Sequence, residues 1–117
     1  MTVEAVQHPY AMLFGVSGRV DGENAGELQQ VLLAGLTPEV RYLVLDLAEL
    51  AYISSMGLST ILTVAKRLDA QSGTLMVSGL NAKLRQTFQF SGFDTLFPVH
   101  LTVAEALADC ERRATAG

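Results

Sequence analysis

Cysteine and basic residues are scarce in this chain, and their scarcity argues against several classes of protein. The 117 residues include one cysteine, Cys110, which cannot form an internal disulfide. A chain without disulfides is typical of a reducing compartment, so we expect a cytoplasmic protein. Charged residues make up 17% of the chain, with a formal sum of -4 and no run of lysine or arginine. Nucleic-acid binding relies on a basic patch, and the charge pattern therefore argues against it.

Long apolar runs and clusters of metal ligands are also missing from the sequence. A membrane-spanning helix needs roughly 18 consecutive apolar residues, and no stretch reaches that length, so no membrane contact is expected. The first residues, Met-Thr-Val-Glu-Ala, lack the basic start and apolar run of a secretory signal. Two separated histidines, His8 and His100, and one cysteine do not make a ligand set. We therefore expect no metal and no cofactor.

Hydrophobic residues make up 50% of the chain, enough for one core, and they follow alternating strand and helix patterns. Apolar patterns typical of strands predict strands at residues 3–6, 10–16, 42–47, 74–77 and 96–99. A period of 3.6 predicts helices at residues 24–36, 55–70, 81–91 and 102–113. The sequence therefore predicts one α/β domain over residues 1–117, with a small, mixed and mostly parallel sheet of four to five strands and about four helices. We expect residues 114–117 to fray.

The two serines at the start of the second predicted helix, Ser54 and Ser55, are the main candidate site. A helix start has unpaired backbone N–H groups and the positive end of the helix dipole. Serine commonly caps such a start, so capping alone explains the pair. Alternatively, one hydroxyl accepts a phosphate, whose charge a helix N-terminus tolerates. The nearest basic residues downstream, Lys66 and Arg67, would lie about 16 Å along the axis, too far to bind that phosphate.

The surroundings of the two serines are predicted to form one edge of the sheet. In open α/β sheets ligands bind outside the carboxyl ends of strands, so residues 18–21, 52–55 and 78–81 should share that edge. On the second helix the buried stripe is expected to be Leu58, Ile61, Leu62, Ala65 and Leu68. The face left exposed would carry Met56, Ser59, Thr60 and Thr63. It is either a docking surface or an ordinary solvated face, and the pattern alone favours neither.

Residues 52–58, Tyr-Ile-Ser-Ser-Met-Gly-Leu, resemble the serine loop of STAS domains, specifically of anti-sigma factor antagonists. Four further segments are similar to that family in the right order. They are the early strand and Gly-Arg-Val-Asp turn at 14–21, the central strand at 43–47, and the segments at 90–97 and 102–107 near the end. The family pattern often has Asp where this chain has Ser54, and Ser or Thr where it has Met56.

The resemblance implies a regulatory protein without catalytic activity. It implies that the unphosphorylated chain binds an anti-sigma factor that is also a serine kinase, and so frees a sigma factor. Phosphorylation of Ser55 by that kinase would release the complex, and a phosphatase would reset it. Residues implied to lie in or near the partner surface are Asp21, Ser54, Met56, Gly57 and Ser59. The sequence does not identify the kinase, the sigma factor, the stimulus or the oligomeric state.

Two other functions are alternatives to the phosphorylation switch: a serine hydrolase and a scaffold without a switch. A serine hydrolase needs its nucleophile in a Gly-x-Ser-x-Gly turn, and Ile53 stands two positions before Ser55. We expect His8 and His100 to be surface side chains and not catalytic bases, with His100 in a loop. Phe93 is expected in the core or in a turn, with a place on the partner surface as the alternative. The second interpretation keeps the STAS fold without the switch, as a constitutive scaffold or accessory subunit of a signalling or lipid-transport complex.

Overall fold

The structure is a computed structural model that describes residues 1–116. The strands, in chain order, are β1 (Thr2–Gln7), β2 (Met12–Val20), β3 (Tyr42–Asp46), β4 (Leu50–Ile53), β5 (Thr74–Ser78) and β6 (Val99–His100). The helices are α1 (Ala25–Ala34), α2 (Ser55–Ala70), α3 (Ala82–Phe90) and α4 (Val103–Thr115), with a short 3-10 turn, η1 (Phe93–Thr95), after α3. The predicted alternation of strands and helices and the start of α2 at Ser55 are confirmed.

The strands form one mixed and mostly parallel sheet, as predicted. Its order is β1-β2-β3-β5-β6; β1 runs antiparallel to β2, and the other neighbours are parallel. The sheet has six strands, and β4 is the one that the sequence did not predict. β3 pairs with the first half of β2 and β4 with the second half, where Val20 is opposite Ile53. Residues 18–20, predicted as a turn, therefore belong to β2.

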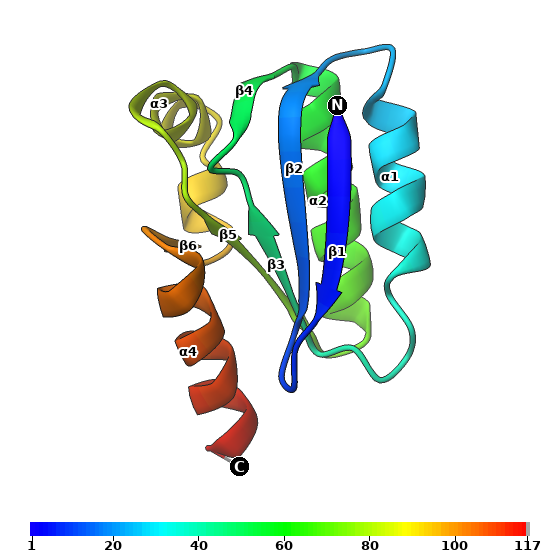
Figure 1. The fold of residues 1–117 in the computed structure, drawn as a ribbon, viewed down its shortest axis with the longest axis vertical. Coiled ribbons are helices and arrows are strands. Elements are labelled where there is room, and N and C mark those ends of the chain that lie inside the picture. The colour runs from blue at the N-terminus through cyan, green and yellow to red at the C-terminus, as the bar shows by residue number, and fades with distance from the viewer. Residues whose placement is uncertain (117) are drawn as a thin grey trace.

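Helices cover both faces of the sheet. Figure 1 shows α1 and α2 side by side, with α4 apart from them on the other side of β3 and β5. The alternation along β3 explains its continuous apolar sequence, because Leu43 and Leu45 join the large core under α1 and α2 while Val44 joins a smaller cluster under α4. A central strand buried on both faces is what the sequence pattern predicted.

The buried face of α2 differs from the predicted stripe. Ile61 and Leu68 are buried as expected, whereas Leu58, Leu62 and Ala65 lie only partly buried at the margin of the core. The other buried residues of α2 are Gly57, Thr60 and Val64. The stripe is displaced because small residues of α2 make close contacts: Gly57 packs against Ile53 of β4, and Thr60 bonds to Ala25 of α1. A pattern based on leucine does not include them.

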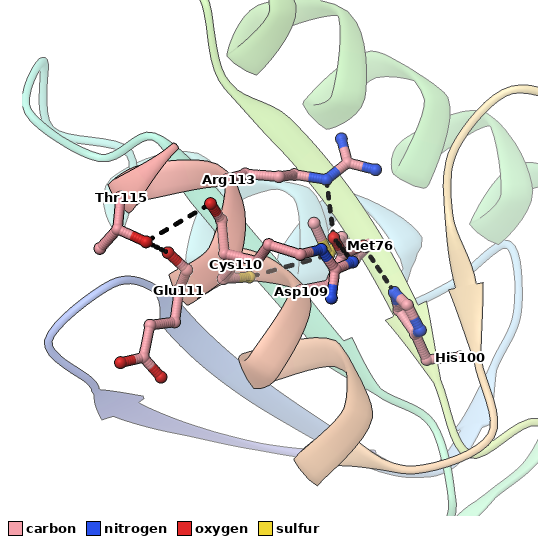
Figure 2. Close-up of polar contacts among 8 residues, drawn as sticks. Met76, His100, Asp109, Cys110, Glu111, Arg113 and Thr115 are labelled. Atoms are coloured by element: carbon pink, nitrogen blue, oxygen red, sulfur yellow. Dashed lines mark hydrogen bonds and ion pairs between the residues drawn. The ribbon is translucent and has the colours of Figure 1, made fainter. Parts of the chain in front are cut away.

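The carboxyl-terminal third corrects one prediction about an aromatic residue. Phe93 is buried and packs edge-on against Phe88 and Phe97, with ring centroids 5.9 Å and 5.7 Å away, so a place on a partner surface is wrong. α4 continues to Thr115, whose hydroxyl donates a hydrogen bond to the backbone oxygen of Glu111 (Figure 2). The last residue of the predicted tail, Gly117, lies outside the described residues.

Candidate functional site

The two serines at the start of α2 have different roles. Ser54 is the N-cap: its backbone is extended, and its hydroxyl oxygen accepts a hydrogen bond of 3.2 Å from the backbone N–H of Gly57. The backbone N–H of Ser54 also donates to the carbonyl oxygen of Val20, which ties the start of α2 to the end of β2. Ser55 is the first residue of the helix and is exposed. The capping role therefore belongs to Ser54, and the Ser55 side chain lies at the surface next to the cap.

Gly57 is buried, which corrects its predicted place on the partner surface. A Cβ atom at this position would lie 2.6 Å from Cγ1 of Ile53 and 2.8 Å from Cγ1 of Val20, closer than carbon atoms pack. Without a side chain there, the first turn of α2 rests directly on the ends of β2 and β4. Gly57 thus positions the neighbouring serines from below the surface.

Thr60 is also buried, at 4% exposure, so its predicted place on the partner surface is wrong as well. Its hydroxyl donates a hydrogen bond of 3.2 Å to the backbone oxygen of Ala25, at the start of α1. The prediction failed because a helical wheel does not show that α1 packs along this side of α2. A buried hydroxyl needs an acceptor, and the α1 backbone supplies one.

Four of the predicted site residues on α2 are exposed and form what we call the α2 face: Ser55, Met56, Ser59 and Thr63. Met56, Ser59 and Thr63 are spaced by three and four residues and so lie along one side of the helix, and Ser55 is next to Met56 in its first turn. Met56 stands out among them because 59% of this large apolar side chain is exposed. A flexible, polarisable thioether at the surface is well suited to contact with another protein.

Asp21 lies at the same end of the sheet, in the turn that follows β2. One oxygen of its carboxylate, Oδ1, accepts hydrogen bonds from the backbone N–H groups of Glu23 and Asn24. The Asn24 side chain accepts a hydrogen bond from the backbone N–H of Asp21 and donates one to the carbonyl oxygen of Arg19. Together the two side chains brace the turn, and the Asn24 side chain makes no cap bond to α1. Because Ser54 bonds to Val20, the structure brings the Asp21 turn and the two serines together.

The turn at residues 78–81 lies beside a different part of the same edge. The carbonyl oxygen of Ser78 accepts from the backbone N–H of Leu47, and the Asn81 side chain donates to the carbonyl oxygen of Leu50. This turn therefore adjoins the link between β3 and β4, at the opposite end of β4 from Ser54. Of the three predicted segments, the first two form the candidate site directly.

Sequence analysis missed one functional candidate, the pair formed by Arg19 and Tyr52. These residues are opposite each other in the β2–β4 ladder, and the guanidinium carbon of Arg19 lies 4.4 Å from the centre of the Tyr52 ring. At this distance the cation is attracted to the face of the ring. Arg19 is part of the Gly-Arg-Val-Asp segment noted in the sequence, but its pairing with Tyr52 depends on β4, which was predicted as a loop.

A second polar cluster holds α4 against β6. Figure 2 shows His100 and Arg113 pointing at Asp109, whose carboxylate accepts from His100 Nε2 and from Arg113 Nε, each at 2.9 Å, and also from Arg112. Burial raises the pKa of Asp109, but the hydrogen bonds and charges of these partners outweigh it and hold the pKa below its usual value. His100 is thus a strand residue with a partly buried structural contact, which corrects its prediction as a surface loop residue.

Cys110 follows Asp109 on α4 and lies in the small core cluster, as predicted. Its sulfur lies 3.7 Å from the sulfur of Met76 (Figure 2). Burial raises the pKa of the Cys110 thiol to about 11, because the thiolate would lose its solvation there. The residue therefore packs as a small hydrophobic side chain.

No three histidine, cysteine, aspartate or glutamate side chains within residues 1–116 gather as metal ligands would. No helix in the same range has the length and apolar character that crossing a membrane requires.

Comparisons with known proteins give consistent results. The family model for the STAS domain matches residues 2–106. BtrV of Bordetella bronchiseptica, assigned as an anti-sigma factor antagonist, is 42% identical over 84 residues, which is 72% of each chain. The crystal structure of an anti-sigma factor antagonist from Mycobacterium paratuberculosis has a TM-score of 0.86 at 25% identity and covers 94% of this chain and 93% of that one. Phosphorylated SpoIIAA of Bacillus, with a TM-score of 0.73 at 17% identity over 92% of this chain and 98% of that one, shares the fold.

Proposed function

The chain belongs to the STAS domain family, and from that premise we propose that it is an anti-sigma factor antagonist controlled by phosphorylation of Ser55. In this proposal the unphosphorylated chain binds an anti-sigma factor that is also a serine kinase, and sigma-factor-dependent transcription follows. The kinase phosphorylates Ser55 and the complex dissociates; a phosphatase then restores the binding form. The similarity to BtrV and to the mycobacterial antagonist supports the regulatory role.

The observation that carries the proposal is the exposed position of Ser55 beside a separate capping residue. Because Ser54 makes the cap bond to Gly57, modification of Ser55 does not remove the cap. A phosphoserine carries roughly -1.5 to -2 charges, and a helix N-terminus is favourable for an anion. The fold is therefore expected to survive the modification, as the shared fold of phosphorylated SpoIIAA illustrates for that protein.

The phosphate is predicted to act by changing the charge of the surface around Ser55. Lys66 and Arg67 are exposed on the third and fourth turns of α2, about 16 Å along the axis, and do not neutralise a phosphate on Ser55. The new charge would lie next to the Met56 side chain and in line with Ser59 on the α2 face. A partner whose apolar surface covers Met56 would have to desolvate that charge, which favours dissociation.

The experiment is phosphorylation in vitro with a purified anti-sigma factor kinase from the same organism and Mg-ATP, followed by mass spectrometry. We expect the mass of one phosphate group to be gained and to map to Ser55. Ser55→Ala should abolish the gain, whereas the matched variants Ser54→Ala and Ser59→Ala should retain it. If the kinase binds tightly and no variant or treatment yields a phosphate on Ser55, the chain acts as a constitutive scaffold or accessory subunit and the switch is contradicted.

A further inference from the structure

The Arg19 guanidinium packs on the Tyr52 ring without an acidic partner among residues 1–116. Ion pairs closer than 4.0 Å within residues 1–116 all involve Asp109, so the Arg19 guanidinium has no carboxylate partner there. Stacking on the ring occupies one face of the guanidinium and fixes its direction. Arg19 is exposed, so the N–H groups of its guanidinium are accessible to a carboxylate, which an arginine binds with two parallel hydrogen bonds.

The pair also has a defined position relative to the candidate site. Val20 and Ile53 turn inward against Gly57, so Arg19 and Tyr52, one residue earlier on each strand, face the opposite side of the sheet. Tyr52 and Ser55 are three positions apart, so their Cα atoms are separated by at most about 10 Å. The turn that holds Asp21 is anchored to Arg19 itself, because the Asn24 side chain donates to the carbonyl oxygen of Arg19. Arg19 therefore lies on the rim of the same edge as Ser55.

From this geometry we infer that Arg19, stacked on Tyr52, binds a carboxylate on the surface of the anti-sigma factor. The inference rests on the proposed function and specifies the chemistry of its partner: an acidic side chain of the anti-sigma factor next to the surface that covers Met56. Arginine and tyrosine are the residues most often found as energetic centres of protein interfaces, and here the two are already held together.

The inference also gives the switch a physical mechanism. The Cα atoms of Tyr52 and Ser55 are at most about 10 Å apart, which is comparable to the Debye length at 0.1 M salt. A phosphate on Ser55 would therefore add negative charge near the place where the partner's carboxylate binds, and would repel that carboxylate. Release of the partner follows from like charges placed close together, and no rearrangement of the sheet or of α2 is required.

The test measures the affinity of unphosphorylated variants for the purified kinase that phosphorylates Ser55, by calorimetry without nucleotide. Arg19→Glu should weaken binding at least about tenfold, as expected for loss of an interface arginine that is also replaced by a like charge. Lys66→Glu makes the same charge change at an exposed site farther along α2 and should change affinity less than about twofold. Arg19→Lys should fall between wild type and Arg19→Glu, because an ammonium group lacks the planar pair of donors. The thermal midpoint of each variant checks that it is folded.

A second experiment identifies the acidic residue of the kinase that binds Arg19. Changing acidic residues of the kinase to lysine, one at a time, should reveal a position that restores binding to Arg19→Glu and weakens binding to wild type. The inference is overturned if Arg19→Glu binds as wild type does, or if it loses no more affinity than Lys66→Glu. It is also overturned if Arg19→Glu affects only the complex with phosphorylated protein, since Arg19 would then contact the chain's own phosphate. Absence of binding by the wild-type chain would instead contradict the proposed function itself.

Discussion

Gly57 of α2 lies so close to Ile53 of β4 that a Cβ atom on the glycine would come within 2.6 Å of the isoleucine Cγ1. This contact sets the distance between the first turn of α2 and the ends of β2 and β4, and with it the position of Ser55. Both neighbours of Gly57, Ile53 and Val20, are core residues that have little room to move. The glycine is therefore a requirement of the packing under the site.

Replacing Gly57 with alanine should lower stability in spite of the better helix propensity of alanine. Overpacking typically costs about 1–3 kcal/mol, and the propensity gain offsets roughly 1 kcal/mol of it. We expect a net loss of up to about 2 kcal/mol in the free energy of unfolding measured with urea. The matched control is Gly26→Ala, because a Cβ atom at that exposed position of α1 meets no atom within 4 Å. It should stabilise the protein, and equal effects from both variants would contradict the packing account.

Thr60→Val should destabilise the protein although valine has almost the same shape. The change removes the hydrogen bond to the Ala25 backbone oxygen, which joins α2 to α1. A bond of this kind contributes about 1 kcal/mol, and we expect a loss of that size in the free energy of unfolding. Thr63→Val, one turn farther on at an exposed position, should change the free energy by less than about 0.5 kcal/mol. Binding of the anti-sigma factor should be the same for Thr60→Val as for wild type, because Thr60 is covered by α1.

The Asp109 cluster predicts a dependence of stability on pH. The folded pKa of Asp109 lies below the unfolded value near 3.8, so the ionised carboxylate stabilises the folded state at every pH above that value. This stabilisation is lost as the pH falls through the folded pKa, where the carboxylate becomes protonated. Asp109→Asn should therefore cost about 1–3 kcal/mol at neutral pH and progressively less under acid conditions. Urea unfolding of both proteins as a function of pH measures the difference; a difference that is constant with pH would contradict the assignment.

Cys110 should be inert in the folded protein. Its side chain is fully buried between α4 and the sheet, and its pKa of about 11 leaves almost no thiolate at neutral pH. We expect a disulfide reagent such as DTNB to leave the folded protein unmodified over minutes and to react fully once urea has unfolded it. Rapid reaction in the absence of urea would show that α4 opens away from β3 and β5 under native conditions.

The elements with strong local signals were predictable from the sequence. The start of α2 is marked by the serine pair, and the start of α4 by Thr102, whose hydroxyl accepts from the backbone N–H of Glu105. The strand at β3 followed from its unbroken apolar run, which reflects burial on both faces. The exposed site residues Ser55, Met56, Ser59 and Thr63 were also placed correctly at the surface.

The parts that could not be predicted depend on contacts between distant segments. β4 has only four residues and no clear alternation, and it is a strand because β2 is long enough to pair with it after β3. Gly57 and Thr60 look like surface residues on a helical wheel until α1 and the ends of the strands are in place. The Arg19–Tyr52 stack and the His100–Asp109 bond join residues 33 and 9 positions apart, so neither is visible as a local motif.

The most direct test of the central claim is the affinity of one purified kinase for the chain before and after Ser55 is phosphorylated. Calorimetry on the two forms, at equal salt and without nucleotide, measures the effect of the phosphate alone. Like charges brought together at an interface cost several kcal/mol, and we therefore expect phosphorylation to weaken binding by about a hundredfold, with circular dichroism unchanged. Equal affinities for the two forms would contradict the account.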